Sequence, residues 1–323
     1  MISVPDPRLR ALEKYQPTEK LVPTSVEILD IPGLTRGANK GEGVGNSFLS
    51  DIRNTDALIH VVRCFDDENL PHVDGSVNPV RDIETIDLEL QIKDLESVEK
   101  KIMRQEKLIR AGEKDAKKVL DVLQVYKAHL EDFQNARTAP VSLEDQKNVA
   151  DLFLLTMKPV MFVCNVDESS AISGNKYVEQ VRTALAGKDA EILVIAGALE
   201  ADITSLEDEN DRLVFLQDAG LDEPGVNKLI RSAYSLLDLE TFFTVGPKEI
   251  RAWTIHKGST APQAAGVIHS DLERGFIRAE VMSFEDFMQY GSEHAVKTAG
   301  KFRVEGKNYL VKDGDILHIR FNV

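Results

Sequence analysis

Short apolar segments separated by long helical stretches constrain the fold of this chain more than any other feature. Four such segments, six to nine residues long and rich in Val, Ile and Leu, cover residues 25–31, 57–65, 159–165 and 191–196. Strands that are apolar on both faces are typical of a parallel sheet covered by helices. The sequence therefore predicts an α/β domain whose first strand ends at Asp30.

A long insertion separates the second and third predicted strands. Its apolar residues recur every seven positions or flank that stripe: Leu88, Ile92, Leu95, Val98, Ile102 and Ile109. After a turn at residues 111–112, a second stripe follows at spacings of three and four: Val119, Leu123, Tyr126, Leu130 and Phe133. This spacing predicts an antiparallel helical hairpin of coiled-coil type, with the stripes in its core and the many Lys and Glu residues facing solvent.

The character of the sequence changes again near residue 242. A helix is predicted over residues 213–237, with a break near residues 223–225. Beyond it we predict one short helix over residues 283–290 and strands over residues 250–255, 275–281, 309–311 and 316–321. These signals predict a small α+β domain of about 80 residues, which is within the usual size of one domain.

Composition excludes several classes of protein. The 323 residues include 39 basic and 54 acidic side chains, and this net charge of −15 argues against a surface covered with nucleic-acid contacts. Cys64 and Cys164 are the only cysteines, so a disulfide scaffold and a cysteine metal site are excluded. No apolar run reaches the ~20 residues of a membrane span. We expect a cytoplasmic protein with neither a membrane nor DNA among its partners.

A motif found in nucleotide-binding proteins follows the first predicted strand. It has the form D-x-x-G and consists of Asp30, Ile31, Pro32 and Gly33. An aspartate at the end of a strand can hold Mg²⁺ through water, and a glycine lets its backbone N–H approach a γ-phosphate. Because D-x-x-G is common by chance, a plain strand-ending turn is the alternative. The glycine-rich residues 41–45 lack the spacing of a dinucleotide-binding fingerprint.

Several segments together resemble one known family. Residues 30–53 are similar to the switch II region of Obg-related GTPases. The segments that resemble the YchF family of ribosome-associated ATPases are residues 63–65, 165–168, 218–225, 253–271 and 321–323. The likeness extends from about Pro5 to Val323. It implies a Ras-like P-loop NTPase domain, incomplete at its N-terminus, with an inserted helical hairpin and a C-terminal β-grasp domain of the TGS type.

The resemblance also implies domain boundaries. The Ras-like domain would comprise residues 1–82 and 152–240, the inserted coiled-coil domain residues 83–151, and the TGS domain residues 241–323. The phosphate-binding motif G-x-x-x-x-G-K-[ST] of the family does not occur in the sequence. A misassigned start codon, a fragment and a degenerate paralogue are three explanations. We expect a shortened gene product or a fragment, because everything after Asp30 reads as intact.

The residue that would position an attacking water is not the glutamine of many GTPases. Leu34 follows the D-x-x-G motif, and a leucine side chain cannot orient water. His72, in the loop after the second strand, resembles the family's mobile-loop histidine and is our candidate for this catalytic role. A histidine of the surface loop without a catalytic role is the alternative.

Residues 165–168 stand where GTPases have N-K-x-D, in which the aspartate accepts two hydrogen bonds from guanine. Here Val166 replaces the lysine and Glu168 replaces the aspartate. The longer side chain of Glu168 misaligns the contact with guanine, at a cost of about 1–3 kcal/mol. We therefore predict that Asn165, Val166 and Glu168 bind nucleotide and favour ATP over GTP, although Asp167 could still reach a guanine.

The resemblance adds further nucleotide contacts. Ala196, Gly197 and Ala198 follow the fourth strand and match the loop that packs on the base. Phe65 matches a residue near the nucleotide, and a position in the core is its alternative.

The function implied is binding and hydrolysis of ATP, or GTP, with Mg²⁺, coupled to association with the ribosome as the large subunit or the 70S particle. Contact with RNA is expected in the TGS domain, where basic and aromatic residues alternate. A non-catalytic ribosome- or RNA-binding remnant is the alternative, because the phosphate-binding motif is absent from the sequence.

Overall fold

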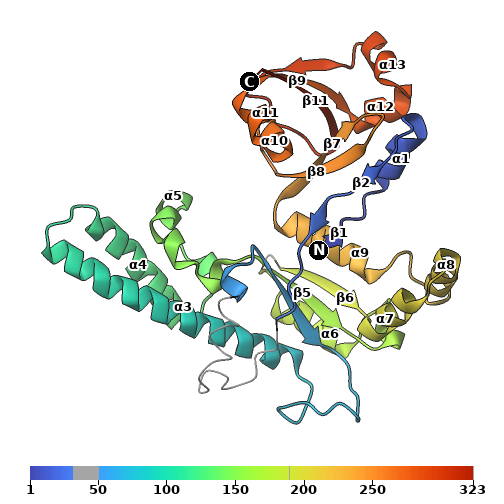
Figure 1. Cartoon of the computed structure of the whole chain (residues 1–323). Helices are drawn as coiled ribbons and strands as arrows, with labels where there is room; N and C mark the ends of the chain where they lie inside the picture. The colour runs from blue at the N-terminus through green and yellow to red at the C-terminus, as the bar shows by residue number, and fades with distance from the viewer. Residues whose placement is uncertain (32–50, 189, 323) are drawn as a thin grey trace. The chain divides into compact units, whose positions relative to one another are not determined.

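The computed structural model describes three stretches of the chain, residues 1–31, 51–188 and 190–322. The chain divides into two compact units, one comprising Asp30–Gly225 and the other combining Met1–Leu29 with Val226–Val323 (Figure 1). Within the three stretches, no helix is both long and apolar enough to cross a membrane.

The Asp30–Gly225 unit is built on a three-stranded parallel sheet. Its strands are β4 (Leu58–Arg63), β5 (Val160–Asn165) and β6 (Glu191–Ile195), in the order β4-β5-β6. The register pairs Arg63 with Asn165 and Asn165 with Ile195, so all three strands end at the same edge. The sequence predicts each of these strands, and their parallel arrangement is confirmed.

Short helices follow β5 and β6 along the chain. They are η5 (Glu168–Ser170), α6 (Lys176–Ala184), α7 (Gly197–Ser205) and α8 (Glu209–Asp218). Val178 of α6 and Ile203 of α7 are buried in one core with Phe162 of β5. This core holds the loops at the carboxyl ends of the strands in place.

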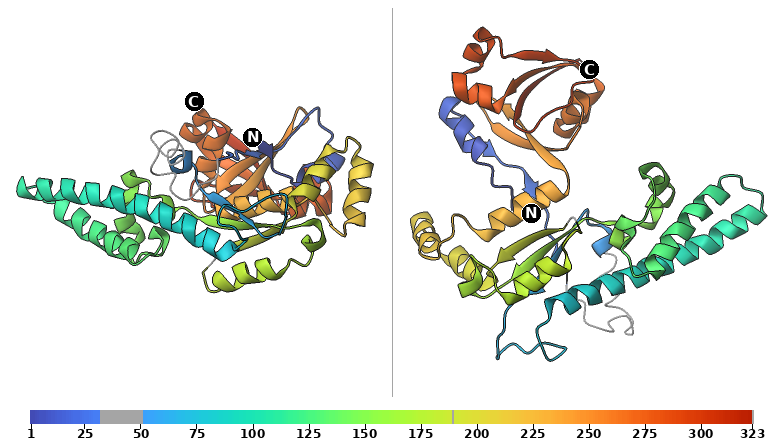
Figure 2. Two further views of the ribbon diagram at one scale, coloured as in Figure 1. Left: turned by 90° about the horizontal axis from the view of Figure 1, so that it is seen from below. Right: turned by 180° about the vertical axis from the view of Figure 1, so that it is seen from behind.

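The predicted helical hairpin is confirmed. Helices α3 (Pro79–Arg110) and α4 (Ala116–Glu131) run antiparallel and pack against each other (Figure 2). Val98, Leu123 and Tyr126 from the two predicted stripes are fully buried between them.

Three residues of the predicted stripes are exposed to solvent. Leu88, Ile92 and Phe133 are 38%, 44% and 69% exposed. Helix α4 has 16 residues against 32 in α3, so at about 1.5 Å per residue it can cover only half of α3. Phe133 lies beyond the end of α4 and has a left-handed backbone, with φ 56°.

Four short helices lead from the hairpin back to β5: η2 (Ala136–Thr138), α5 (Leu143–Gln146), η3 (Lys147–Leu152) and η4 (Leu155–Met157). The buried carboxylate of Asp94 on α3 anchors the last of them. It accepts hydrogen bonds from the amides of Leu155 (2.7 Å) and Thr156 (2.8 Å) and from the Thr156 hydroxyl (2.7 Å). Burial raises the pKa of Asp94 above its usual value, and the three donors oppose that shift.

The second unit contains a six-stranded sheet in the order β10-β9-β11-β7-β8-β2. Its strands are β2 (Leu21–Val22), β7 (Leu239–Val245), β8 (Ile250–His256), β9 (Phe276–Ser283), β10 (Arg303–Glu305) and β11 (Asp315–Phe321). Its helices are α1 (Pro7–Tyr15), α9 (Gly225–Leu236), α10 (Ala261–Ile268), α11 (Ser270–Arg274), α12 (Phe284–Tyr290) and α13 (Glu293–Thr298). The adjacent residues Phe242 and Phe243 of β7 are buried in different cores, the first with residues of α10 and the second with residues of α1 and α12.

The predicted mixture of helix and strand is confirmed, but residues 309–311 contribute only one bridge, between Leu310 and Thr260.

The first 29 residues belong to this second unit, which differs from the predicted assignment of residues 1–82 to the nucleotide-binding domain. The reason is apolar burial: Leu9 and Leu12 of α1 lie in the core that contains Phe243. A short amphipathic helix carries no signal in its sequence for the partner that will bury it.

The prediction of a strand over residues 25–31 is wrong. Strand β3 consists only of Ser25–Val26 and pairs antiparallel with β1 (Ile2–Ser3). Residues 27–31 connect the two units, and none of the described strands pairs with them. A strand needs a neighbour for its backbone groups, so the apolar pattern alone is not sufficient here.

Candidate functional site

The carboxyl ends of β5 and β6 bring together the residues predicted to bind a nucleotide base. Asn165 is the last residue of β5, and its Oδ1 accepts a hydrogen bond of 3.0 Å from the amide of Gly197, the first residue of α7. A Cβ atom on Gly197 would lie 3.0 Å from that same oxygen, so the glycine is what permits this close contact. Ala196 is buried before the helix, and Ala198 is exposed on its first turn.

The three residues after Asn165 have different structural roles. Val166 is buried, and its amide donates to the carbonyl of Ile195 at 3.0 Å, so its side chain belongs to the core. Asp167 caps η5: its carboxylate accepts hydrogen bonds from the Ser169 hydroxyl (2.5 Å) and the Ser170 amide (3.1 Å). The hydrogen bond from Ser169 lowers the pKa of Asp167.

Glu168 is the carboxylate of this segment that no other described residue engages. Its side chain is exposed, and it makes no hydrogen bond or ion pair with any other residue in the described parts of the chain. Asp167, the other acidic residue of the segment, is already used by the turn. The structure therefore separates a structural aspartate from a free glutamate, a distinction that the sequence alone leaves open.

The loop after β4 begins beside Asn165. The amide of Cys64 donates to the carbonyl of Asn165 at 2.8 Å, and Phe65 follows directly. The guanidinium of Arg63 stacks over the ring of Phe65 at 4.8 Å, and its Nε and Nη1 donate to the carbonyls of Phe65 (3.1 Å) and Leu70 (2.7 Å). The side chain of Phe65 is half-buried. Arg63 covers one face of its ring and fixes the start of the loop.

Sequence reasoning missed Asn175, which ties two of these loops together. Its Oδ1 caps α6 by accepting from the Tyr177 amide at 3.0 Å. Its Nδ2 donates to the carbonyl of Cys64 (2.7 Å) and to the Ser170 hydroxyl (3.3 Å). The signal in the sequence is an asparagine before a helical stretch, which predicts a cap but not the second role.

His72 lies in the loop between β4 and α3 and is held by its neighbours. Its Nε2 is 3.0 Å from Oδ2 of Asp82, and its Nδ1 accepts a hydrogen bond of 3.1 Å from the amide of Asp74. Arg81 Nη2 lies 3.4 Å from the same Nδ1. Because both neighbours of Nδ1 are donors, the hydrogen bonds assign the proton of the neutral ring to Nε2, which donates it to Asp82. Both ring nitrogens are therefore engaged.

The same three side chains have the composition of a metal site. One ligand atom from each of His72, Asp74 and Asp82 lies within 4.8 Å of the others. Arg81, however, pairs with both carboxylates, at 3.5 Å from Asp74 and 2.9 Å from Asp82. Its guanidinium already supplies the positive charge that this cluster needs, so we assign no metal to it.

Asp30 is the predicted ligand of Mg²⁺. Its carboxylate is exposed and makes no hydrogen bond or ion pair within the described residues. Mg²⁺ is usually bound by one or two carboxylates together with phosphate oxygens and water, so a single free carboxylate fits this ion. Ile31 packs beside the buried Ile52. Pro32 and Gly33, like Leu34, lie outside the described residues.

Two protein families match segments of the chain. The family YchF-GTPase_C, described as "Protein of unknown function (DUF933)", matches residues 239–322. The family MMR_HSR1, described as "50S ribosome-binding GTPase", matches residues 11–109.

Relatives are similar over the whole chain. The "Ribosome-binding ATPase YchF" of Haemophilus influenzae is 46% identical over 323 residues, covering 100% of this chain and 88% of the relative. The protein of the same name from Bacillus subtilis is 48% identical, with the same coverage, and "Obg-like ATPase 1" of Pongo abelii is 41% identical over 99% of this chain and 82% of its own length. The solved structure of the Schizosaccharomyces pombe YchF GTPase superposes with a TM-score of 0.89 at 35% identity, covering 98% of this chain and 86% of that one. The chain therefore belongs to the YchF family, and the P-loop GTPase fold expected from its sequence is confirmed.

Proposed function

We propose that the Asp30–Gly225 unit binds a purine nucleoside triphosphate, with the base at the carboxyl ends of β5 and β6. The observation that carries this proposal is the hydrogen bond between Asn165 Oδ1 and the Gly197 amide. Because Oδ1 is engaged there, the Nδ2 group of Asn165 remains as a donor for a ligand. The N7 atom that adenine and guanine share is an acceptor, so Asn165 would select purines as a class.

Glu168 would choose between the two purines, in favour of ATP with GTP as the second candidate. Guanine presents two adjacent donors, which a short, well-aligned carboxylate binds best. Asp167 has the right length, but its carboxylate caps η5 and is held by Ser169. The free carboxylate of Glu168 is one methylene longer, and it can accept a hydrogen bond from the amino group of adenine.

Hydrolysis would depend on Asp30 and His72. Asp30 would hold Mg²⁺, which neutralises phosphate charge when it is bound. His72 would position the attacking water through one ring nitrogen, for which it must first leave Asp82. A non-catalytic nucleotide- or ribosome-binding role is the second candidate, and the engagement of both nitrogens of His72 is the observation that favours it.

Association with the ribosome, as the large subunit or the 70S particle, would accompany nucleotide binding, as the names of the relatives indicate for those proteins. The segment 241–323 would be a TGS domain in contact with RNA. In support, the guanidinium of Arg251 lies 4.1 Å from the ring centre of Trp253, a pair that offers both a cation and a stacking surface.

Competition binding tests the nucleotide proposal. ATP and GTP would each displace a fluorescent ATP analogue from the wild-type chain and from the Asn165→Ala, Glu168→Asp and Glu168→Gln variants. We expect Asn165→Ala to weaken both nucleotides and Glu168→Asp to move the ratio of affinities towards GTP, with Glu168→Gln as the control for loss of charge. An unchanged ratio in Glu168→Asp would place selectivity elsewhere. Equal binding by Asn165→Ala and the wild type would reject the proposed base site.

A further inference from the structure

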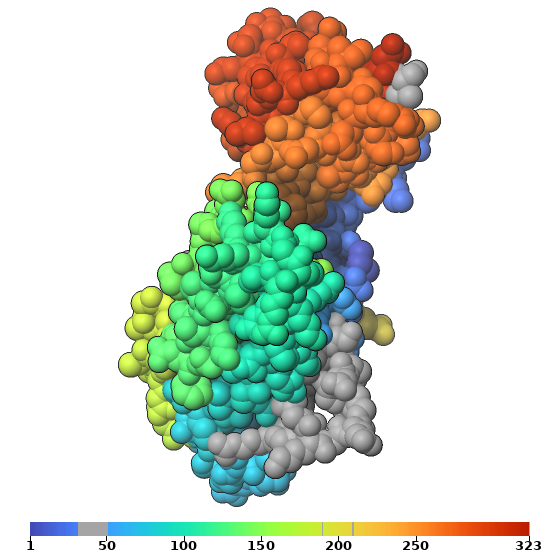
Figure 3. Space-filling model, turned by 90° about the vertical axis from the view of Figure 1, so that its left-hand side faces the viewer, coloured from blue at the N-terminus to red at the C-terminus, as the bar shows by residue number. Residues whose placement is uncertain are grey.

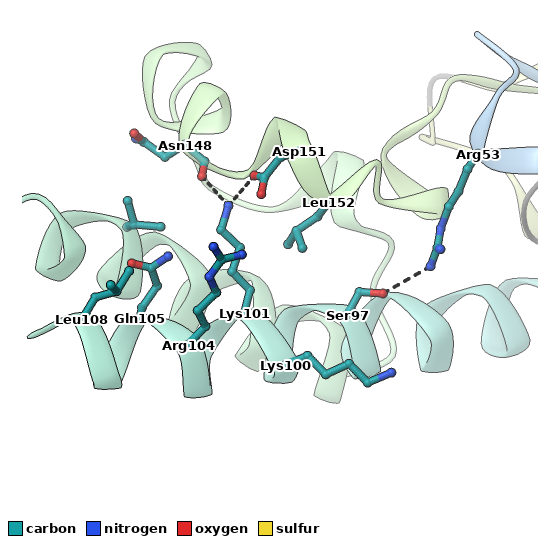
Figure 4. A pocket seen from close by; sticks show the side chains of 11 residues that line it. Arg53, Ser97, Lys100, Lys101, Arg104, Gln105, Leu108, Asn148, Asp151 and Leu152 are labelled. Carbon is teal, nitrogen blue, oxygen red and sulfur yellow. Dashed lines mark hydrogen bonds and ion pairs between the residues drawn. The ribbon is translucent and has the colours of Figure 1, made fainter.

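The helical hairpin faces the viewer in Figure 3. A polar groove lies along one side of this hairpin. It has a volume of about 630 Å³, which is within the range of small-molecule sites. One wall is the face of α3 from Ser97 to Leu108, and the other is η3 with Asn148 and Asp151 (Figure 4). Arg53 reaches the groove from the short helix at residues 51–53 and donates to the Ser97 hydroxyl at 3.4 Å.

The charge of this groove is strongly positive in a chain that is acidic overall. Arg53, Lys100, Lys101 and Arg104 line it, against the single carboxylate of Asp151. That carboxylate is already paired with Lys101, whose Nζ also donates to a backbone carbonyl of η3 at 2.8 Å. Three cations therefore remain. Lys100 and Arg104 are exposed and form no ion pair within the described residues.

In Figure 4 the Lys100 side chain runs along α3 and the Arg104 side chain rises towards Lys101, and both are exposed, so each is free to turn towards a phosphate of a bound ligand. Lys100 and Arg104 are four residues apart on α3, which is a rise of about 6 Å along the helix. A guanidinium binds a phosphate through two parallel N–H groups, and an ammonium adds a mobile point charge. Gln105 supplies a neutral hydrogen-bonding group on the same wall, whereas the Ser97 hydroxyl already donates to the carbonyl of Lys93 at 3.0 Å.

The groove also has apolar lining. Leu108 lies at the end away from Arg53, beside Gln105, and Leu152 lies between Asp151 and Ser97 (Figure 4), so a ligand could pack a ring against either while its phosphates meet the cations. A continuous nucleic-acid strand would instead need a long basic track of even depth. We propose that this groove binds a small, multiply phosphorylated ligand through Arg53, Lys100 and Arg104.

Such a ligand would join two parts of the Asp30–Gly225 unit. Arg53 belongs to the short helix next to the sheet, where Lys158 Nζ donates to its carbonyl at 3.1 Å, whereas Lys100 and Arg104 belong to the hairpin. An anion held by both sides would fix the hairpin against the sheet. The site contains none of the residues assigned to the base, so this inference goes beyond the proposed function and stands without it.

Calorimetric titration of the full chain with sodium tripolyphosphate, without Mg²⁺ and at constant salt, tests the proposal. The variant that removes the site is Lys100→Gln/Arg104→Gln. The matched control is Lys107→Gln/Lys114→Gln, which removes the same charge from exposed positions of the hairpin region outside the groove. We expect tripolyphosphate to bind the wild type saturably, the control within twofold of it, and the groove variant at least tenfold more weakly, with unchanged circular dichroism. An adenosine polyphosphate titrated in the Asn165→Ala background shows whether the apolar lining adds affinity beyond the phosphates.

Three results would overturn the proposal. The first is the absence of saturable binding to the wild type. The second is an equal loss in the groove variant and the control, which would mean general attraction by a basic surface. The third is binding of a short single-stranded RNA that depends on Lys100 and Arg104 while tripolyphosphate does not bind. A failure of the base site would appear instead in the Asn165→Ala competition experiment, with groove binding intact.

Discussion

Replacing Gly197 by alanine tests the base site with the smallest possible perturbation. The backbone of Gly197 does not have the positive φ that requires glycine, and it begins helix α7, so an alanine fits the main chain. Its Cβ, however, would lie 3.0 Å from Oδ1 of Asn165 and 3.6 Å from its Cγ and Nδ2. All the strain therefore falls on the side chain that we propose to contact the purine.

The expected loss is set by the hydrogen bond from Nδ2 of Asn165 to the purine. Asn165 must move by a few tenths of an ångström, which misdirects Nδ2. One such bond contributes about 0.5–1.5 kcal/mol, so we expect ATP affinity to fall by about that amount, or about 2- to 12-fold. Alanine is favoured over glycine in a helix by up to about 1 kcal/mol, so the free energy of unfolding should not fall by a comparable amount.

Fluorescence titration with an ATP analogue measures this effect. Gly306→Ala is the matched control, because a Cβ there meets no atom within 4 Å. We expect Gly306→Ala to bind as the wild type does and Asn165→Ala to bind at least as weakly as Gly197→Ala. If Gly197→Ala binds ATP within twofold of the wild type while Asn165→Ala is impaired, the contact between these two residues does not orient the base-binding group.

Four further outcomes follow from other contacts. In single-turnover hydrolysis at saturating ATP, His72→Ala should lower the rate at least tenfold with little change in ATP affinity, because a water-positioning group acts in the transition state. A wild-type rate would limit His72 to a structural role, through its hydrogen bonds with Asp82 and the Asp74 amide. Asp94→Ala leaves three buried donors without an acceptor, so the free energy of unfolding in urea should fall by about 3–5 kcal/mol. A loss below about 1 kcal/mol would show that these hydrogen bonds do not anchor the segment. Hydrogen bonding to Cys164 and burial raise the pKa of Cys64, so the buried Cys64 thiol should react with a disulfide reagent about 100-fold more slowly in the native protein than in urea. Burial raises the pKa of Tyr309 to about 12, above its unfolded value of about 10, so its contribution to stability should be complete below pH 10 and lost as the pH rises to 12, and Tyr309→Phe should remove that part of the pH dependence.

The strands and the hairpin could be predicted because their signals are local. Strands β4, β5 and β6 are apolar runs whose length and composition define them, and parallel order then places Asn165 and Gly197 at one edge. The hairpin follows from its spacing of three and four. Leu88 and Ile92 fall outside its core because the shorter α4 does not cover that part of α3. The sequence pattern does not show how far α4 extends.

The remaining differences arise from partners distant in the chain. The apolar pattern of residues 25–31 could not reveal that only Ser25–Val26 would find a neighbouring strand. Helix α1 is amphipathic, but its burial beside Phe243, about 230 residues away, is set by tertiary packing. The bond from His72 to Asp82 spans only ten residues, but it joins a loop to a helix, and no spacing rule predicts such a pair.

The case of Asp167 shows why side-chain contacts decide the choice of ligand here. As a sequence, residues 165–168 offer two carboxylates to a base, and the aspartate has the length that guanine needs. In the folded chain, the turn after β5 is short, and its first amides need an acceptor; Asp167 supplies it, with Ser169 and Ser170 as donors. To read guanine, Asp167 would have to give up these bonds and leave η5 uncapped. The selectivity proposed for ATP therefore has two sources, the extra methylene of Glu168 and the cost of releasing Asp167. Ser169→Ala should loosen the second source and raise GTP affinity, whereas an unchanged GTP affinity would leave the length of Glu168 as the whole explanation.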